Sequence, residues 1–511
     1  MQAARASRPG ALAVFHSLQH GTSTFTLEQM HKQAERLARG FSRLGLGKGD
    51  VLAIQLPNTL ENAIAHLAAA RLGIVVLPIV SIYGAKELNF ILEDAGARAL
   101  VLSGTTDAHR TARLLSSLEC ADVEHFIICG QTPNQTGISR LEELLEGEGD
   151  IPDPAKVNPS DIALILYTSG TTSLPKGVLH SHESLLAEFF AQTDQGKDQV
   201  GIVLSPWPPG HIAGTIGLLG HSLLGRDSVI MQRWDANAAA QLIENYRVEQ
   251  TSGTPLHLMG ILDAASTGGY DLSSLKRFIT GATTVPETIV AAAIARDISA
   301  VRSYGSTEFP TATQSNTDDP LEKRLKTDGR PMPGCDIRIV DEDLNDLPIG
   351  SDGEILIRGP ERAISYTDPF RTAEAFLDDG WFRTGDIGRL DAEGFMTVTD
   401  RKKDIIIRGG ENISSLEVED LILQIPGVQE VAAIAAPHER LGETVCAVIV
   451  TQSGQSISLD MIDRHFRSLG VARQKTPELL ILRDALPRSP TGKVLKTELR
   501  AQVRADLKDD G

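Results

Sequence analysis

The chain has 511 residues, of which 41% are apolar and 23% are charged, a composition typical of globular proteins. A single hydrophobic core stops growing at roughly 250–300 residues, so this length predicts more than one domain. The formal net charge of −18 argues against a general nucleic-acid binder and against adhesion to anionic membranes, because both need a basic face.

The first third of the chain alternates helical and strand patterns. Thr26 and Gln29 have capping-box spacing, and apolar residues recur at three- and four-residue steps from Leu27 to Leu44, which predicts an amphipathic helix. Further on, we expect strands at 51–55, 74–77 and 99–102 and helices at 61–72 and 85–95. This order predicts a parallel sheet covered by helices, with ligands at the carboxyl ends of its strands.

The pattern changes from about Asp336. Short runs punctuated by Gly, Asp and Pro predict antiparallel strands with tight turns at 336–340, 353–358 and 395–399. A smaller unit follows, with expected helices at 417–424 and 459–469 and strands at 428–436 and 444–450. We place the domain boundary at 401–404, which gives an N-terminal domain of residues 1–401 and a C-terminal domain of residues 402–511.

Cysteine usage and hydropathy predict a cytoplasmic protein. The four cysteines are scattered without metal-ligand spacing, and so large and cysteine-poor a chain disfavours a disulfide framework. The longest apolar stretches, 74–80 and 212–224, are interrupted and fall short of the ~18–20 residues of a membrane span.

A loop rich in small hydroxyl residues follows the expected strand 162–166. It reads Tyr-Thr-Ser-Gly-Thr-Thr-Ser-Leu-Pro-Lys-Gly over 167–177, and exposed N–H groups, hydroxyls and the Lys176 ammonium suit a polyphosphate. The spacing differs from a Walker A loop. The alternative is an ordinary Gly/Ser/Thr turn.

Two further segments offer polar groups just after glycines. The run Tyr304-Gly-Ser-Thr-Glu308 supplies an aromatic face for a base, a hydroxyl for a phosphate and a carboxylate for Mg²⁺. The run Trp381-Phe-Arg-Thr-Gly-Asp386 supplies an acceptor for two ribose hydroxyls. A turn with a solvated Glu, and a capping Asp, are the alternatives.

The last two segments lie in and beyond the expected boundary. The charged run 400–404 leads into Gly409-Gly-Glu-Asn412, which suits either a solvated linker or a hinge. The run Pro487-Arg-Ser-Pro-Thr-Gly-Lys493 carries a lysine on a glycine-containing loop, which alone favours plain surface charge.

Together, these five segments, in this order and spacing, resemble the adenylate-forming superfamily of acyl-CoA synthetases, peptide-synthetase adenylation domains and beetle luciferases. The resemblance covers essentially the whole chain. It implies an α/β fold with a large N-terminal domain of two layered βαβ subdomains plus a distorted β-barrel, and a small mobile α+β C-terminal domain. It also implies an AMP-forming acid–thiol ligase that uses ATP, Mg²⁺ and coenzyme A.

The resemblance assigns a role to each motif position. It implies that Lys493 bridges the acid's carboxylate and the α-phosphate, that Glu308 holds magnesium, and that His211 lies beside the acyl carboxylate. The implied nucleotide-binding residues are Thr168, Ser169, Gly170, Thr171, Thr172 and Lys176 for the β- and γ-phosphates, Gly281, Ala282 and Tyr304 for adenine, Thr307 for the α-phosphate, and Asp386 and Arg401 for ribose, with Gly305 as a further cofactor-binding residue.

The C-terminal domain is expected to rotate about Lys403, which withdraws Lys493 and brings Gly409 and Gly410 to the pantetheine tunnel. Lys475 and its neighbour Arg473 occupy positions where related ligases carry basic residues near CoA. Ordinary surface charge is the alternative for this pair.

The predicted substrate is a small-molecule carboxylic acid, with no role for nucleic acid or membrane. Small residues around 211–225 and the string at 305–310 resemble the branch that acts on cyclohexanecarboxylate and medium-chain acids, which favours an alicyclic, bulky or medium-chain acid. Ser173, Trp207 and Ser415 depart from the usual pattern, which leaves open an enzyme that performs only thioester formation on an acyl-adenylate made by a partner enzyme. A ligase that loads a carrier protein is a further alternative.

Overall fold

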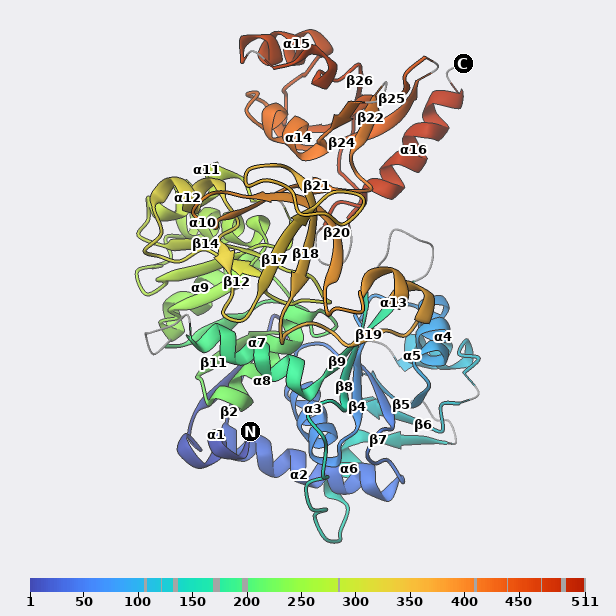
Figure 1. Cartoon of the computed structure of the whole chain (residues 1–511). Coiled ribbons are helices and arrows are strands. Elements are labelled where there is room, and N and C mark those ends of the chain that lie inside the picture. The colour runs from blue at the N-terminus through green and yellow to red at the C-terminus, as the bar shows by residue number, and fades with distance from the viewer. Residues whose placement is uncertain are drawn as a thin grey trace. The chain divides into compact units, whose positions relative to one another are not determined.

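The computed structural model describes residues 1–511 except 105–107, 121, 132–136, 169–174, 195–200, 284, 409–410, 439, 470, 489–492 and 510–511. The chain divides into two compact units. Figure 1 labels the helices and strands and colours the chain by residue number. Unit 1 comprises Met1–Leu325, Met332–Cys335 and Arg358–Gly380, and unit 2 comprises Lys326–Pro331, Asp336–Ile357 and Trp381–Gly511. The boundary at 401–404 stays a prediction.

One sheet of unit 1 has the strand order β19-β9-β8-β4-β3-β5-β6-β7. Strands β4, β3, β5, β6 and β7 run parallel and β8 joins them in parallel, whereas β9 and β19 are antiparallel. The strands are β3 Val51–Gln55, β4 Val75–Pro78, β5 Ala97–Ser103, β6 His125–Cys129, β7 Ile138–Arg140, β8 Ile162–Thr168, β9 Lys176–Ser181 and β19 Ser365–Tyr366.

Seven helices accompany this sheet in the described part of the chain, and the first of them, α2, begins at a capping box. The predicted capping box is present, because the Thr26 hydroxyl accepts from the Gln29 N–H and the Gln29 side chain accepts from the Thr26 N–H. The helices here are α2 Leu27–Arg43, α3 Leu60–Leu72, α4 Ala85–Asp94, α5 Ala108–Ser116, α6 Leu141–Glu146, α7 His182–Asp194 and α13 Pro369–Ala375.

The other sheet of unit 1 runs in the order β15-β14-β13-β12-β10-β11-β1-β2. Its central strands are parallel, and β15 and β2 are antiparallel at the ends of this run. Its elements are α1 Gln2–Ser7, β1 Leu12–Ser17, β2 Gly21–Thr26, β10 Val203–Ser205, α8 Ile212–Leu224, β11 Ser228–Met231, α9 Ala236–Tyr246, β12 Gln250–Gly253, α10 Pro255–Gly268, β13 Arg277–Thr280, α11 Glu287–Ile294, β14 Ser299–Tyr304, β15 Thr313–Gln314 and α12 Leu321–Lys326.

Unit 2 contains two further sheets. A four-stranded sheet has the order β17-β18-β20-β21, and the other pairs β23-β22-β25-β24, with β26 parallel to β25. Its elements are β16 Arg330–Pro331, β17 Asp336–Val340, β18 Gly353–Arg358, β20 Phe382–Leu390, β21 Met396–Arg401, β22 Ile406–Arg408, β23 Glu411–Ile413, α14 Ser415–Leu423, β24 Val428–His438, β25 Gly442–Thr451, α15 Leu459–Ser468, the 3₁₀ turn Arg473–Lys475, β26 Leu479–Leu482 and α16 Lys496–Asp509.

The predicted mixed α/β architecture is confirmed. The helices and strands expected in the first third are present with ends shifted by one or two residues. No helix in the described part of the chain is long and apolar enough to cross a bilayer.

Candidate active site

Three polar side chains of unit 1 meet beside the predicted phosphate loop. Lys176 begins β9, Glu308 follows β14, and Tyr366 ends β19. The Lys176 Nζ lies 2.5 Å from the Glu308 Oε1, and it donates to the Tyr366 hydroxyl at 2.8 Å. The Tyr366 hydroxyl in turn donates to the same Glu308 oxygen at 2.6 Å. The fold thus brings together a cation, a phenol and a carboxylate that are far apart in sequence.

Electrostatics keep the Glu308 carboxylate ionised although it is buried. Burial alone would raise the pKa of Glu308, but the Lys176 ammonium and the hydrogen bonds from Lys176 and Tyr366 lower it below its ordinary value. Burial and the neighbouring carboxylate raise the pKa of the Tyr366 phenol, so it remains a donor. A charged acceptor is therefore held ready near neutral pH.

At Gly305 and Gly281, the neighbouring backbone leaves no room for a side chain larger than hydrogen. A Cβ on Gly305 would lie 2.0 Å from the Pro310 carbonyl oxygen, and one on Gly281 would lie 2.3 Å from that of Ser303. Ala282 has φ of 65°, in the left-handed region that is uncommon for alanine. Tyr304 ends β14, and the predicted adenine-binding residues accordingly lie where neighbouring parallel strands end.

The phosphate loop itself is described only at its edges. Ser169, Gly170, Thr171 and Thr172 lie outside the described residues. Thr168, the last residue of β8, has a buried Oγ1 that finds no hydrogen-bond partner among the described residues, which exclude 169–174. A buried hydroxyl without a partner is costly, and a phosphate oxygen would satisfy it.

His211 lies at the N-terminus of α8 among aromatic rings. The Trp207 ring stacks on His211 with a centroid distance of 6.0 Å and lies 5.5 Å from the ring of His257. Trp207 also donates from its indole nitrogen to the Ser252 hydroxyl at 2.9 Å. These contacts fix the orientation of Trp207, which is 6% exposed.

In unit 2, the predicted ribose-binding residues form an ion pair. Asp386 on β20 and Arg401 on β21 are register partners, and the Arg401 Nε lies 2.9 Å from the Asp386 Oδ1. Asp386 is 4% exposed, and the Arg401 guanidinium contacts one of its two carboxylate oxygens in this buried position.

Lys493 lies within electrostatic range of this pair. Burial and the Arg401 guanidinium lower the pKa of Lys493 to about 7, against the opposing effect of Asp386. Unit 2 therefore brings together three of the predicted site residues, and the lysine is poised to gain a proton when an anion arrives.

The expected hinge lies in a tight turn. The amides of Asp404 and Ile405 both donate to the Arg401 carbonyl, and the Asp404 carboxylate pairs with Arg500 at 2.6 Å, beside Lys403 in the same turn. Gly409 and Gly410 lie outside the described residues.

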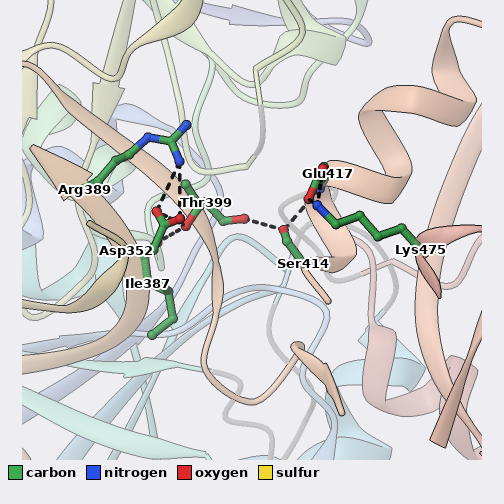
Figure 2. A network of polar contacts seen from close by, with 7 residues as sticks. All are labelled: Asp352, Ile387, Arg389, Thr399, Ser414, Glu417 and Lys475. Carbon is green, nitrogen blue, oxygen red and sulfur yellow. Dashed lines mark hydrogen bonds and ion pairs between the residues drawn. The ribbon is translucent and has the colours of Figure 1, made fainter. Parts of the chain in front are cut away.

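Figure 2 follows a chain of hydrogen bonds from the β20–β21 pair to Lys475. The Ser414 hydroxyl donates to the Thr399 carbonyl at 2.6 Å and caps α14 by accepting from the Glu417 N–H. Lys475 then pairs with the Glu417 carboxylate at 2.6 Å. Lys475 is thus tied to α14, and its predicted contact with CoA requires exchange of this exposed pair.

Comparison with known proteins decides the family. The family model described as AMP-binding enzyme matches residues 1–367, and that of the AMP-binding enzyme C-terminal domain matches residues 417–493. The chain belongs to the AMP-binding enzyme family. The predicted adenylate-forming acyl-CoA synthetase is confirmed, with ATP, CoA and a small carboxylic acid as its reactants and AMP as a product.

Relatives within the AMP-binding enzyme family match over nearly their whole lengths. The chain is 32% identical to the medium-chain fatty-acid–CoA ligase of Escherichia coli (strain K12), covering 100% of this chain and 90% of that one. It is 34% identical to the indoleacetate–CoA ligase of Aromatoleum aromaticum, covering 93% and 92%. The structure of ATP-bound MatB from Rhodopseudomonas palustris aligns with a TM-score of 0.85 and 27% identity over 97% of this chain and 96% of that one.

The residues of this AMP-binding enzyme fit Mg²⁺ brought in with ATP. Mg²⁺ prefers oxygen ligands and is usually held by one or two carboxylates together with substrate phosphates. Glu308 supplies an ionised carboxylate, and the described residues contain no cluster of three or more candidate ligand side chains. When bound, the ion neutralises negative charge on the phosphates.

Sequence reasoning missed two residues of the site. The His180 Nε2 on β9 lies 2.7 Å from the Thr307 carbonyl oxygen. Burial lowers the pKa of His180, so its neutral ring donates to this oxygen and holds the 304–308 segment. Tyr366 was missed because its role depends on Lys176 and Glu308, which are distant in sequence. A histidine just after the phosphate-loop lysine was the available signal for His180.

Proposed function

We propose that this protein is an acid–CoA ligase that activates a medium-chain, alicyclic or otherwise bulky carboxylic acid as its acyl-adenylate and transfers the acyl group to CoA. The observation that carries the proposal is the buried Glu308 carboxylate held by Lys176 and Tyr366 at the strand ends. Such a cluster suits the polyphosphate of a nucleotide, because it combines a cation with an ionised metal ligand.

In the proposed first step, an oxygen of the acid's carboxylate attacks the α-phosphorus of ATP. A bond forms between them, the bond to the bridging oxygen of the β-phosphate breaks, and pyrophosphate leaves. The carboxylate is ionised at neutral pH, so the step needs positioning and charge stabilisation rather than a strong base. We assign Lys493 and Thr307 to the α-phosphate, and Lys176 with Thr168, Ser169, Gly170, Thr171 and Thr172 to the leaving phosphates.

Within unit 1, we assign the adenine to Tyr304, Gly281 and Ala282, with Gly305 in the same nucleotide-binding segment. Within unit 2, we assign the ribose hydroxyls to Asp386 and Arg401. Asp386 has capacity for these hydroxyls because a carboxylate accepts several hydrogen bonds and Arg401 occupies only part of it.

In the proposed second step, the CoA thiolate attacks the acyl carbon, the acyl–phosphate oxygen bond breaks, and AMP leaves. We assign the pantetheine arm to Gly409 and Gly410, which lie outside the described residues, and we assign Lys475 to CoA. Rotation about Lys403 exchanges the two arrangements.

The aromatic cluster around His211 supports a compact or ring-shaped acyl group. The Trp207 indole is held by its hydrogen bond to Ser252 and by ring contacts with His211 and His257, so an acyl group does not easily displace it. A flat, rigid wall favours cyclic and short-branched acids through stacking and restricts long flexible chains. Similarity to ligases named for medium-chain fatty acid and for indoleacetate supports the same class.

We also propose a cytoplasmic location. All four cysteines are free, and three of them are buried. This state fits a reducing compartment.

The experiment is detection by mass spectrometry of acyl-CoA and AMP from purified protein with ATP, Mg²⁺, CoA and a panel of alicyclic, aromatic and fatty acids. The proposal expects both products, with cyclic and medium-chain acids turned over fastest. A parallel reaction with synthetic acyl-adenylates in place of acid and ATP separates the half-reactions. Product only from acyl-adenylates would instead support an enzyme confined to thioester formation. Product only with a phosphopantetheinyl carrier protein would overturn CoA as the acceptor.

A further inference from the structure

Two buried glutamates near the active site have no part in the chemistry proposed above. Glu188 lies in α7 and is 2% exposed, and Glu361 lies between β18 and β19 and is 0% exposed. Burying an ionised carboxylate without a partner costs several kcal/mol, so each of these groups must be neutral or well paired.

The available donors satisfy only part of this pair. The Glu188 Oε1 accepts from the Thr311 hydroxyl at 2.9 Å and from the Gln192 amide at 3.3 Å. Within the part of the chain that the structure describes, the Glu188 Oε2 has no donor and Glu361 has no side-chain donor, although the Thr311 backbone acts on the Glu361 carboxyl group. Two carboxylates cannot hydrogen bond to each other, but one proton between them supplies the missing donor.

The electrostatics agree with a shared proton. Burial raises the pKa of both carboxyl groups, and Glu188 raises that of Glu361 further. The other ionisable groups described on these elements are Lys176, His180, His182, Glu183, Tyr304, Glu308, Arg358, Arg362 and Tyr366. Lys176 is paired with Glu308, the Arg362 guanidinium lies over the Phe376 ring, and no described cation acts on the carboxyl group of Glu188 or Glu361. No cation therefore offsets the repulsion between Glu188 and Glu361.

The pair joins three segments that together hold Glu308. Thr311 lies on the same segment as Glu308, three residues further on. The Glu361 segment continues to Ala363, whose N–H donates to the Glu308 carbonyl at 2.8 Å, and to Tyr366, whose hydroxyl donates to the Glu308 carboxylate. Helix α7 follows directly on β9, which carries Lys176.

We propose that Glu361 is a positioning residue, a neutral carboxylic acid that donates to Glu188 and thereby fastens α7 and the 358–366 segment to the segment carrying Glu308. It touches no reactant. It acts through the orientation of the Glu308 carboxylate, which affects binding of the magnesium–nucleotide complex. The inference therefore rests on the proposed function.

The first test measures pyrophosphate release with ATP and the best acid of the panel. Glu361→Gln keeps the volume and a donor, so its KM for MgATP stays within about threefold of wild type. Glu361→Ala leaves Glu188 buried without its donor, which raises the KM for MgATP by about tenfold or more. Glu183→Ala, on an exposed position of α7, is the matched control and leaves the KM unchanged.

A pH series distinguishes this role from simple packing. In wild type, the KM for MgATP rises on the alkaline side as the shared proton is lost, and in Glu361→Gln this rise is smaller because only the contribution of Lys493 remains. Lys493 titrates in both proteins, so the difference between them isolates the pair. An alkaline rise of equal size in both proteins would overturn the proposal, as would Glu361→Gln behaving like Glu361→Ala.

A stability measurement tests the shared proton independently of activity. Because the folded-state pKa of Glu361 is raised, wild type loses stability as pH rises from the ordinary glutamate pKa toward the raised one, and Glu361→Gln does not. The Tm of Glu361→Gln relative to wild type should therefore increase by about 2 °C or more between pH 5 and pH 8. An unchanged Tm difference would overturn the shared proton. If wild type turned over no acid, the proposed function would fail while this measurement would still decide the state of the pair.

Discussion

At the residue scale, the site depends on a few side chains whose charge is set by their neighbours. Glu308 is kept ionised by Lys176 and Tyr366, whereas Lys493 is brought close to neutrality by burial and Arg401. Both pKa values are lowered, which keeps the Glu308 carboxylate charged and makes the Lys493 ammonium easier to neutralise. The free protein thus holds a carboxylate that can bind a cation, and an amine that binds an anion best after it takes up a proton.

Lys176→Met removes the cation beside Glu308 at similar side-chain length. We expect kcat/KM for pyrophosphate release to fall about 10²-fold or more, because an oriented positive charge on the leaving phosphates is lost. Lys48→Met is the matched control, since Lys48 forms a half-exposed ion pair with Asp161 and should change the rate less than twofold. Equal rates for the two variants would contradict the role given to Lys176.

Lys493 should take up a proton when MgATP binds. With a pKa of about 7 in the free protein, roughly 0.9 of the lysines are neutral at pH 8, and the bound anion favours the charged form. Calorimetry at pH 8 in two buffers of different ionisation enthalpy measures this uptake. Lys493→Gln should abolish it, and uptake that persists in the variant would assign the proton elsewhere.

At the element scale, much of the fold follows from local pattern. The strand 51–55 and the capped helix from Leu27 are where periodicity and the Thr26–Gln29 box place them, because short-range capping and burial decide both. The ends of strands shift by a residue or two, as with β4 at Val75–Pro78, because pairing with neighbours extends or trims them.

The sequence motifs predict which segments carry the candidate site. They do not predict which side chains of different segments contact one another. The glycine and hydroxyl strings locate the strand ends, but the Tyr366–Glu308 bond and the Glu188–Glu361 pair join segments that only the folded sheet brings together. The tie between Lys475 and Glu417 has the same origin, since it depends on how the 473–475 turn packs near α14.

The backbone turn at Gly305 offers a test at this scale. Gly305→Ala would put a Cβ 2.0 Å from the Pro310 carbonyl oxygen, so the turn that carries Glu308 must shift. We expect a cost of about 1–3 kcal/mol, seen as a lower Tm, together with loss of pyrophosphate release. Gly47→Ala, where a Cβ has open space, is the control and should leave both unchanged.

At the scale of the whole molecule, we propose that one chain performs two reactions by exchanging arrangements about the turn at 401–405. The hydrogen bonds of Asp404 and Ile405 to Arg401 make this turn compact, and the Asp404–Arg500 pair ties it to α16, which follows closely after Lys493. Movement of the turn is thus coupled to the lysine of the first step.

Lys403→Pro fixes φ at this position and restricts the preceding residue. We expect thioester formation from a supplied acyl-adenylate to fall at least about tenfold relative to pyrophosphate release, because one of the two arrangements becomes hard to reach. Lys403→Ala removes the side chain but leaves the backbone free, and it should preserve the ratio of the two rates. An unchanged ratio in the proline variant would place the hinge elsewhere.

The most direct test of the proposed ligase is to measure both half-reactions of Lys493→Ala side by side. Pyrophosphate release from acid and ATP follows the first, and acyl-CoA formed from synthetic acyl-adenylate and CoA follows the second. We expect the first rate to fall by about 10²-fold or more while the second stays within a few-fold of wild type, since Lys493 stabilises charge only in adenylation. Equal loss of both rates would contradict the division of labour proposed for this site.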